Sequence, residues 1–188
     1  MAVLPIRITG DPVLHTAARD VVDFDESLAT LVRDMEDTMA AAPGVGLAAP
    51  QVGVSLRLFV YNWRDESGEL HRGTAINPEL WISPPTVGEL DEESESEGCL
   101  SIPGERFPLR RADRAILRAT ELDGTAYEVT TQGWLARIFQ HEYDHLDGLL
   151  YADRLSYPAD RLMAKTIRRR SWGGPGVSWT PGVDHLED

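Results

Sequence analysis

The stretch Gln140-His141-Glu142-Tyr143-Asp144-His145 contains the pattern H-E-x-x-H, in which two histidines stand four positions apart. On a helix these two side chains lie on one face, close enough to share a metal ion. The same face extends to Trp134, Ile138 and Leu149, which are apolar. We therefore predict a helix over residues 134–150, with a buried face that is apolar at both ends and carries the histidines in its middle.

A third ligand is needed to complete such a site, and two common metalloprotease patterns do not supply it. The pattern H-E-x-x-H-x-x-G-x-x-H requires a third histidine. Here Gly148 is present, but Tyr151 stands at the histidine position. A second class takes a glutamate from a later helix, and this sequence has none between Glu142 and Glu187. The alternative interpretation is a helix with two buried histidines and an unrelated glutamate.

Cys99, in the segment Glu97-Gly98-Cys99-Leu100-Ser101, is the remaining good ligand. A Cys/His/His set leaves a fourth metal position open to water, as catalytic sites do. A thiolate also makes a site attractive to a redox-active divalent metal and liable to oxidation. Taken alone, however, a single cysteine is more often a buried apolar residue than a ligand. As the only cysteine, it excludes an internal disulfide and is typical of a reducing cytosol.

A third segment, Gly44-Val45-Gly46-Leu47-Ala48-Ala49-Pro50-Gln51, combines small residues with an amide side chain. Small residues let a backbone or a substrate approach closely. Gln51 could donate a hydrogen bond to a carbonyl oxygen. A tight turn between a helix and a strand explains the same spacing equally well.

Length and charge limit the class of protein. The chain has 188 residues, which fits one domain, and a net charge of −13, which argues against broad nucleic-acid binding and against DNA as a partner. No apolar run is long enough to span a membrane, and the N-terminus lacks the features of a secretory signal. We expect a cytoplasmic protein.

The rest of the sequence predicts short strands and flanking helices, and thus one α+β domain over residues 1–170. A helix over residues 23–42 would be capped by Asp25 or Ser27 and end at Pro43-Gly44. We expect a solvated acidic loop over residues 89–97. The Gly/Pro/Trp-containing segment 171–188, with Trp172 and Trp179, is predicted to be a tail without regular structure. The other predicted elements are strands over residues 56–63, 74–81, 115–121 and 126–131, and a helix over residues 158–170.

Taken together, the three quoted segments resemble the peptide deformylase family. That family has G-x-G-L-A-A-x-Q, E-G-C-L-S and Q-H-E-x-D-H in this order, and this chain matches each of them. The resemblance extends to about residue 170. It implies a fold of mostly antiparallel strands around a central metal-binding helix, with one helix near each end of the chain. It also implies a hydrolase of protein biosynthesis that co-translationally removes the N-formyl group from the N-terminal methionine of nascent polypeptides, releasing formate.

The resemblance further implies a role for each site residue. Cys99, His141 and His145 would bind one divalent metal ion, with Fe²⁺ as the native ion and Zn²⁺, Ni²⁺ or Co²⁺ as substitutes. Glu142 would be the general acid/base that activates a metal-bound water for attack on the formyl carbon. The side chain of Gln51 and the backbone N–H of Leu100 would bind the formyl oxygen.

For the substrate, the resemblance implies an N-formyl-methionyl peptide that lies beside Gly44, Val45 and Gly46 as an added strand. The methionine side chain should enter an apolar pocket, for which Val45, Trp134 and Ile138 are the local candidates. Arg106 matches an arginine near the family's substrate cleft. Arg137 stands where an apolar helix residue is expected, so this wall of the pocket is not settled by the sequence.

Two other functions are compatible with parts of the pattern. One is an H-E-x-x-H peptidase with an unusual cysteine ligand, which would cleave unformylated peptides at internal bonds. The other is a binding module that keeps a structural metal without catalysis. Such modules usually lose the general base or an oxyanion donor, whereas this sequence retains Glu142 and Gln51.

The predicted third helix is basic in an otherwise acidic chain, and family members are thought to dock on the ribosome through a C-terminal helix. A local basic patch of this kind could contact ribosomal RNA. The alternative is a set of cations that stabilises the C-terminus of the helix. The cations in question are Arg161, Lys165, Arg168, Arg169 and Arg170.

Three further histidines, His15, His71 and His185, have no convincing partner in the sequence and are expected in loops or on the surface.

Overall fold

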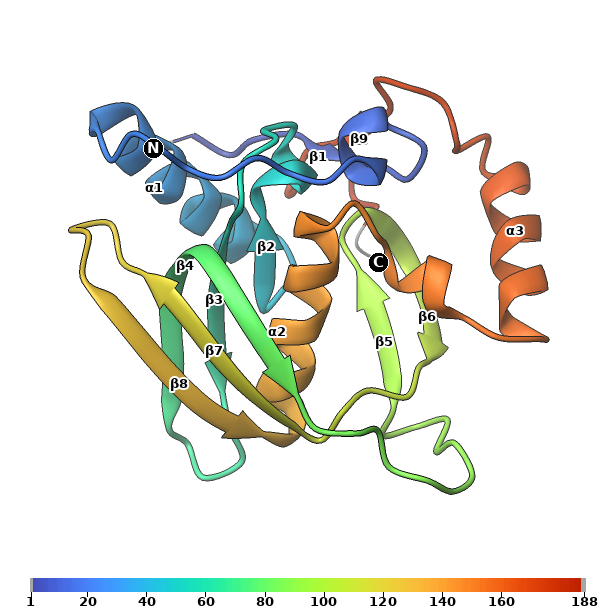
Figure 1. Cartoon of the computed structure of the whole chain (residues 1–188). Coiled ribbons are helices and arrows are strands. Elements are labelled where there is room, and N and C mark those ends of the chain that lie inside the picture. The colour runs from blue at the N-terminus through green and yellow to red at the C-terminus, as the bar shows by residue number, and fades with distance from the viewer. Residues whose placement is uncertain (1, 187–188) are drawn as a thin grey trace.

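The computed structural model describes residues 2–186, so Glu187, which the sequence analysis named, lies outside the described residues. Helix α2 (Gly133–Leu146) runs through the middle of the molecule. A five-stranded sheet lies on one side of α2 and a two-stranded sheet on the other (Figure 1). The predicted α+β fold with mostly antiparallel strands around this helix is confirmed. The strands of the larger sheet, in spatial order, are β2 (Gly46–Ala48), β3 (Leu58–Arg64), β4 (Leu70–Ile82), β7 (Arg114–Thr120) and β8 (Ala126–Gln132).

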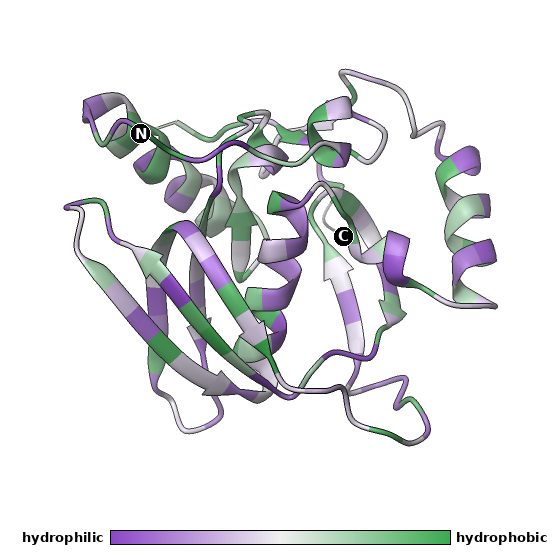
Figure 2. Cartoon of the chain, viewed as in Figure 1, coloured by the Kyte–Doolittle hydropathy of each residue, from purple (hydrophilic) through white to green (hydrophobic). Residues whose placement is uncertain are grey.

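The four longer strands of this sheet correspond to the four predicted strands, because their side chains alternate or form short apolar runs. Strand β7 buries Ala115, Leu117 and Ala119, of which Leu117 and Ala119 pack in a cluster with α2, and exposes the residues between them. The resulting hydrophilic and hydrophobic bands are visible in Figure 2. Strand β2, at the edge of the sheet, has only three residues and was not predicted.

The smaller sheet consists of β5 (Ser96–Cys99) and β6 (Ile102–Pro108), which pair antiparallel. The prediction of a solvated acidic loop up to residue 97 is wrong at its end, because Glu97 lies within β5 and is only 4% exposed. Like charges do repel, but Glu97 meets arginines that are distant in the sequence. Strand β5 thereby carries both Glu97 and Cys99 towards α2.

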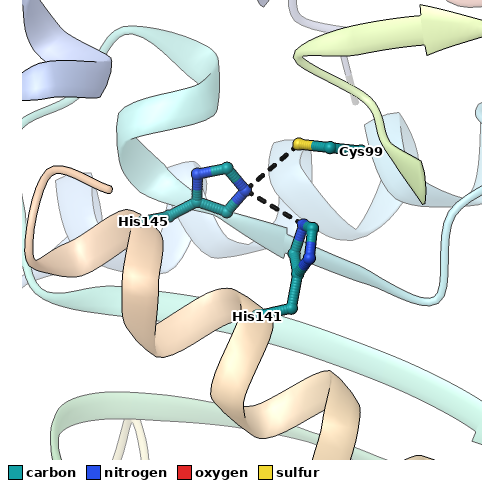
Figure 3. Close-up of side chains that lie close together, drawn as sticks. All are labelled: Cys99, His141 and His145. Carbon is teal, nitrogen blue, oxygen red and sulfur yellow. Dashed lines mark hydrogen bonds between the residues drawn. The ribbon is translucent and has the colours of Figure 1, made fainter. Parts of the chain in front are cut away.

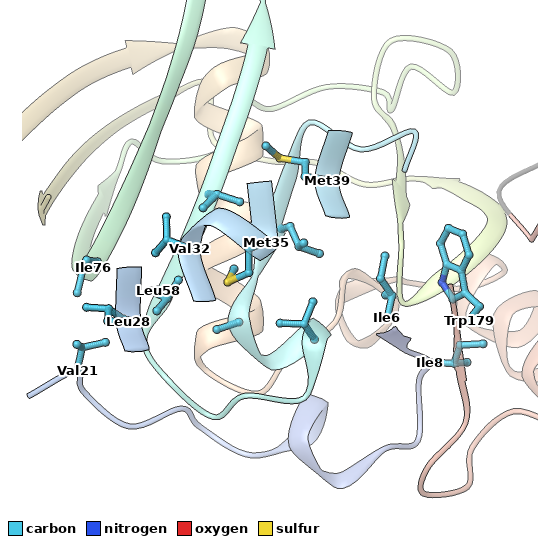
Figure 4. Close-up of a cluster of buried hydrophobic side chains, with 14 residues drawn as sticks. Ile6, Ile8, Val21, Leu28, Val32, Met35, Met39, Leu58, Ile76 and Trp179 are labelled. Carbon is cyan, nitrogen blue, oxygen red and sulfur yellow. The ribbon is translucent and has the colours of Figure 1, made fainter. Parts of the chain in front are cut away.

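Helix α1 (Glu26–Ala41) begins where the sequence indicated. The Asp25 side chain accepts hydrogen bonds from the backbone N–H groups of Ser27 and Leu28, so Asp25 is the N-cap residue. The apolar face of α1 packs in a core that also contains Ile6 and Ile8 from the N-terminal part and Trp179 from the C-terminal part (Figure 4). The members that Figure 4 labels are Ile6, Ile8, Val21, Leu28, Val32, Met35, Met39, Leu58, Ile76 and Trp179.

Helix α2 ends four residues earlier than predicted, so Leu149 does not lie on the helical face of the histidines. Gly148 has φ +75°, a conformation that favours glycine. A Cβ atom at Gly148 would also lie 2.7 Å from the backbone of Thr16. The chain therefore turns here beneath the N-terminal segment, which a continued helix would not allow.

The C-terminal part contains α3 (Ala159–Arg169) and a segment that returns to the body of the molecule (Figure 1). The prediction of a tail without regular structure is wrong at β9 (Ser178–Trp179), which pairs antiparallel with β1 (Ile6–Arg7). Trp179 is 1% exposed, so a large apolar area is removed from water at this point.

The three remaining histidines lie away from the α2 histidines. His15 and His185 are exposed, as expected. His71 lies on β4, and its Nε2 is 3.0 Å from Asp65 Oδ2, a partner that the sequence did not reveal.

Within residues 2–186, no helix has the length and apolar character that crossing a membrane requires.

Candidate metal centre and substrate cleft

Cys99 at the end of β5 and two histidines one turn apart on α2 bring their ligand atoms together (Figure 3). Cys99 Sγ lies 3.3 Å from His145 Nε2, and His145 Nε2 lies 3.2 Å from His141 Nε2. All three atoms lie within 4.8 Å of one another. The residues that the sequence nominated as ligands thus form one cluster, although Cys99 is distant from the histidines in the chain.

This cluster fits a divalent metal ion in both spacing and chemistry. Two nitrogens that each lie about 2.0–2.1 Å from a tetrahedral ion are separated by roughly 3.3–3.4 Å. The observed separation of the two Nε2 atoms is 3.2 Å. One thiolate and two imidazoles suit zinc, iron, nickel or cobalt better than calcium or magnesium. A three-residue set also leaves a fourth position for water or substrate.

Glu97 holds His141 in the orientation that a metal ligand needs. His141 Nδ1 lies 2.7 Å from Glu97 Oε1. Because a carboxylate only accepts hydrogen bonds, Nδ1 carries the proton and Nε2 keeps the lone pair that faces the other ligands. Burial would raise the pKa of the Glu97 carboxyl, but hydrogen bonds and opposite charges from His141 and Arg111 bring it below its ordinary value. Glu97 is therefore an anion in contact with the candidate metal centre.

Buried arginines compensate the charge of Glu97. Arg111 donates to Glu97 Oε1 at 2.6 Å and to Asp144 Oδ2 at 2.6 Å. Arg137 donates to Glu97 Oε2 at 3.0 Å and to the carbonyl oxygen of Leu109 at 2.7 Å. Buried charges are tolerated when they are paired and hydrogen-bonded in this way. The sequence pattern of the helix led us to expect an apolar residue at position 137. Arg137 stands there instead because it donates to Glu97 and to Leu109.

Replacing Glu97 by glutamine should weaken metal binding. Glutamine replaces the carboxylate by a neutral amide, so the hydrogen bond from His141 loses its charged acceptor, and Arg111 and Arg137 lose their buried counter-charge. Mutation of a residue that orients a metal-binding histidine typically costs about 10- to 100-fold in metal affinity or activity. We expect Glu97→Gln to release metal to a chelator faster by a factor in this range, measured by the absorbance of a metal indicator.

The matched control for this experiment is Glu95→Gln. Glu95 is a neighbouring carboxylate that pairs with Arg110 and is more exposed than Glu97. Its replacement should leave metal release unchanged within about twofold. Equal release rates in the two variants would show that the negative charge of Glu97 does not support the site.

Glu142 is buried beside the ligand cluster. It is 3% exposed, and its Oε2 has no hydrogen-bond partner within residues 2–186. Burial is the main cause that raises its pKa to about 7. A Cβ atom at Gly46 would lie only 2.3 Å from Glu142 Oε1, so glycine leaves the space that this carboxyl group occupies. A carboxyl group with a pKa near neutrality can both take up and release a proton at physiological pH.

Gln51 points its amide nitrogen towards the cluster. Its Oε1 accepts a hydrogen bond from the backbone N–H of Ala48 at 2.8 Å, which sets the orientation of the amide. Its Nε2 consequently faces Cys99 Sγ at 3.7 Å and Ser101 Oγ at 3.3 Å. The sequence left open whether this segment is a turn or a binding element. The structure shows β2 followed by a 3-10 helix, Ala49–Val52, which directs Gln51 inward.

A cleft of about 550 Å³ opens over the cluster. All six residues that the sequence assigned to substrate binding line this cleft: Gly44, Val45, Gly46, Arg106, Trp134 and Ile138. The proposed catalytic residues Gln51, Leu100 and Glu142 and the ligands Cys99 and His141 line it as well. His145 belongs to the ligand cluster but does not line the cleft, because it is fully buried. Every site residue predicted from the sequence therefore lies at or directly beneath one cavity.

Sequence reasoning missed the charged residues that surround the cluster, namely Glu97, Arg111 and Asp144, and it missed the contact between Trp179 and Leu100. Glu97 stood in an acidic run, which hid it. Arg137, an arginine on the apolar face of a helix, was the one visible signal, because a buried arginine requires a buried anion. Trp179 gave no local signal of its contact with the site.

Comparisons with known proteins agree with this architecture. The family model described as polypeptide deformylase matches residues 3–161. The chain is 50% identical over 185 residues to peptide deformylase 2 of Corynebacterium efficiens, covering 98% of this chain and 96% of that one. The crystal structure of peptide deformylase from Thermus thermophilus has a TM-score of 0.75 and 38% identity, covering 89% of this chain and 94% of that one.

A third similar structure contains a bound tripeptide. It is a class I type b peptide deformylase from Acinetobacter baumannii with Met-Ala-Ser, and it has a TM-score of 0.71 and 34% identity, covering 81% of this chain and 98% of that one. The family model and these relatives extend over most of this chain. The chain therefore belongs to the polypeptide deformylase family, whose members remove the N-formyl group from nascent polypeptides.

Proposed function

We propose that this deformylase hydrolyses N-formyl-methionyl peptides at the Cys99–His141–His145 cluster, with Glu142 as its general acid/base. The observation that carries the proposal is the position of Glu142. Its buried carboxyl group, of which one oxygen has no partner among the described residues 2–186, stands beside three convergent metal-ligand atoms in a cleft. A merely structural metal site has no need of such a group.

The metal would be held by Cys99, His141 and His145, with Fe²⁺ as the native ion and Zn²⁺, Ni²⁺ or Co²⁺ as substitutes. When bound, a divalent ion supplies Lewis-acid activation of water and of the formyl oxygen. The donor set of one thiolate and two imidazoles is compatible with all four ions. Glu97 supports the set because it fixes the tautomer of His141.

Glu142 would move the protons of the reaction. Its carboxylate accepts a proton from the attacking water, and its carboxyl form returns a proton to the departing amine. Burial supports both steps, since it brings the pKa of this group to about 7. The space left by Gly46 keeps the carboxyl group beside the cleft rather than displaced from it.

Two donors would hold the formyl oxygen as negative charge develops on it. One is Gln51 Nε2. The Gln51 Oε1 atom accepts a hydrogen bond from the Ala48 N–H, and this orients Nε2 towards the cleft. The other is the backbone N–H of Leu100, the residue after the cysteine ligand. Donors that are oriented before the reaction stabilise the transition state without reorganisation.

The substrate would lie along the free edge of β2. This strand ends the five-stranded sheet and, within residues 2–186, pairs with β3 alone, so a peptide can add to its other side by β-augmentation. Val45, Trp134 and Ile138 would form the methionine pocket, and Arg106 would lie at its rim. The Acinetobacter baumannii enzyme with bound Met-Ala-Ser supports a peptide of this kind as a ligand for the cleft.

The activity is tested by measuring formate release from formyl-Met-Ala-Ser with protein purified without oxygen. We expect formate release and about one metal ion per chain. Unformylated Met-Ala-Ser serves as the control substrate and should remain intact. Cleavage of the unformylated peptide without formate release would instead indicate a peptidase, and bound metal without either activity would indicate a non-catalytic homologue.

We also propose that the protein acts in the cytoplasm, where nascent chains are made, and that it contacts the ribosome through α3. Arg161, Lys165 and Arg168 are exposed and follow one another at helical spacing. Arg169 and Arg170 instead lie within 4 Å of Glu105 at the cleft, at 3.7 and 3.6 Å from its Oε1. The first three are therefore the better candidates for contact with RNA phosphates.

Replacing Arg161, Lys165 and Arg168 by glutamine should weaken binding to ribosomes. The logarithm of the binding constant falls linearly with the logarithm of the salt concentration. Each lost phosphate contact makes this slope shallower by about 1, so the triple variant should have a slope that is shallower by about 3. Co-sedimentation at several salt concentrations measures this slope. The control is a triple glutamine variant of arginines on the large sheet, Arg64, Arg72 and Arg114. Equal slopes for both variants would exclude docking through α3.

A further inference from the structure

The C-terminal segment crosses the N-terminal segment before it reaches the interior. Gly173 N–H donates to the carbonyl oxygen of Thr9 at 3.0 Å, and Ile8 N–H donates to that of Val177 at 2.9 Å. Strand β9 then pairs with β1. These contacts direct the side chain of Trp179 into the core beside Ile6 and Ile8 (Figure 4).

Trp179 also reaches the candidate active site. Its Nε1 donates a hydrogen bond to the carbonyl oxygen of Leu100 at 2.8 Å. Trp179 is 1% exposed overall, yet its side chain contributes to the lining of the cleft. Leu100 stands between the Cys99 ligand and Ser101, so the indole contacts the loop that follows the ligand.

The peptide unit that Trp179 holds is the one that donates to the cysteine sulfur. The carbonyl group of Leu100 and the N–H group of Ser101 belong to one planar unit and point in opposite directions. Ser101 N–H lies 3.4 Å from Cys99 Sγ and donates to it. Fixing the carbonyl end of this unit with the indole therefore fixes the direction in which the N–H end points.

The other side of Leu100 is also confined. A Cβ atom at Gly44 would lie 2.8 Å from Leu100 Cδ1, so the Leu100 side chain is packed against the glycine segment. Leu100 is thus held at its side chain by this contact and at its carbonyl oxygen by the indole. The N–H of Leu100, which the proposed function uses as an oxyanion donor, lies in the neighbouring peptide unit.

From these contacts we infer that Trp179 is a positioning residue of the metal centre. Through the Leu100–Ser101 peptide unit it directs the Ser101 N–H onto Cys99 Sγ, and so ties the C-terminal segment to the thiolate ligand. A hydrogen bond to a ligand sulfur withdraws charge from it and restricts its movement. The inference rests on the proposed function only in taking Cys99 as a metal ligand.

The experiment compares Trp179→Phe with wild type after substitution of the metal by Co²⁺. Phenylalanine keeps an aromatic ring in the core and removes the indole donor. A second variant carries 3-benzothienylalanine at position 179, in which sulfur replaces the N–H within a ring system of the same shape. The control is Trp172→Phe, in the same segment. Its ring packs against both the α1 core and the cluster that contains Cys99, and it lies under the Arg170 guanidinium. It therefore controls for loss of an indole that packs near the site but does not donate to Leu100.

Three quantities are measured in each protein: the sulfur-to-cobalt charge-transfer band, the rate of cobalt loss to a chelator, and the thermal unfolding midpoint. In both Trp179 variants we expect a shifted band and cobalt loss that is about fivefold faster, the effect of one typical hydrogen bond. In Trp172→Phe both quantities should match wild type. The benzothienyl variant should also retain the unfolding midpoint of wild type, because its packing is preserved.

A band and a cobalt-loss rate that match wild type in the benzothienyl variant would overturn the inference and leave Trp179 as a packing residue only. The result is independent of the proposed reaction. If wild type binds cobalt through sulfur but releases no formate from formyl-Met-Ala-Ser, the proposed function fails, while the band and the cobalt-loss rate still decide the role of Trp179.

Discussion

Glu142→Gln is expected to slow formate release by roughly 10²- to 10⁴-fold, the usual contribution of a general acid/base. Glutamine has nearly the same shape as glutamate, so it fits the space beside Gly46. It cannot take up a proton from water or return one to the leaving amine. The side chain does not belong to the cluster of ligand atoms, and we therefore expect the metal content to remain about one ion per chain.

The measurement is kcat for formyl-Met-Ala-Ser together with the metal content of the same sample. Glu36→Gln, an exposed glutamate on α1, is the matched control and should retain wild-type activity. Full activity in Glu142→Gln, with metal bound, would remove Glu142 from the mechanism. A loss of metal together with activity would instead assign Glu142 to the support of the metal site.

Cys99→Ser is expected to lose metal affinity by more than about 100-fold, beyond the usual effect of altering a contact around a ligand. A cysteine coordinates metal as a thiolate, whereas a serine hydroxyl stays protonated at neutral pH and is a much poorer ligand. The two histidines alone would hold the ion weakly. Formate release should fall in parallel with metal content.

This prediction is tested by titrating metal-free protein with Co²⁺ or Zn²⁺ in both forms. The apo wild-type protein is the control for folding, since its thermal unfolding midpoint should match that of the variant. Added metal at high concentration should partly restore activity to the variant. Metal binding that is as tight as in wild type would show that the thiolate is not a ligand.

Much of the fold was predictable where local patterns dominate. Helix α1 follows from its apolar spacing and the Asp25 cap, and the four long strands follow from alternation. These features depend on neighbours along the chain, which the sequence displays directly. None of the strands β2, β5, β6 and β9 was predicted. Strands β2, β5 and β9 have only two to four residues, and β6 does not alternate between apolar and polar residues, so they carry little periodic signal.

The acidic segment illustrates a different limit. Glu97 lies in a run of like charges, and such a run usually faces solvent. In the folded chain it is buried between Arg111 and Arg137, and the His141 ring meets the same carboxylate. Its partners lie 14, 40 and 44 positions away. Only the folded chain brings these charges close enough for attraction to exceed the cost of burial.

The sequence by itself determined the chemistry of the site and the placement of its two histidines. Their spacing puts them on one face of any helix, and the three ordered motifs identify the ligand set and Glu142 as candidates. The tertiary structure decided how this chemistry is held in place. It brought Cys99 to α2, fixed His141 through Glu97, and carried Trp179 from the far end of the chain to Leu100. The physical reason is that helical spacing is a local property of the backbone, whereas ligand geometry and buried charge pairs depend on contacts that only packing creates.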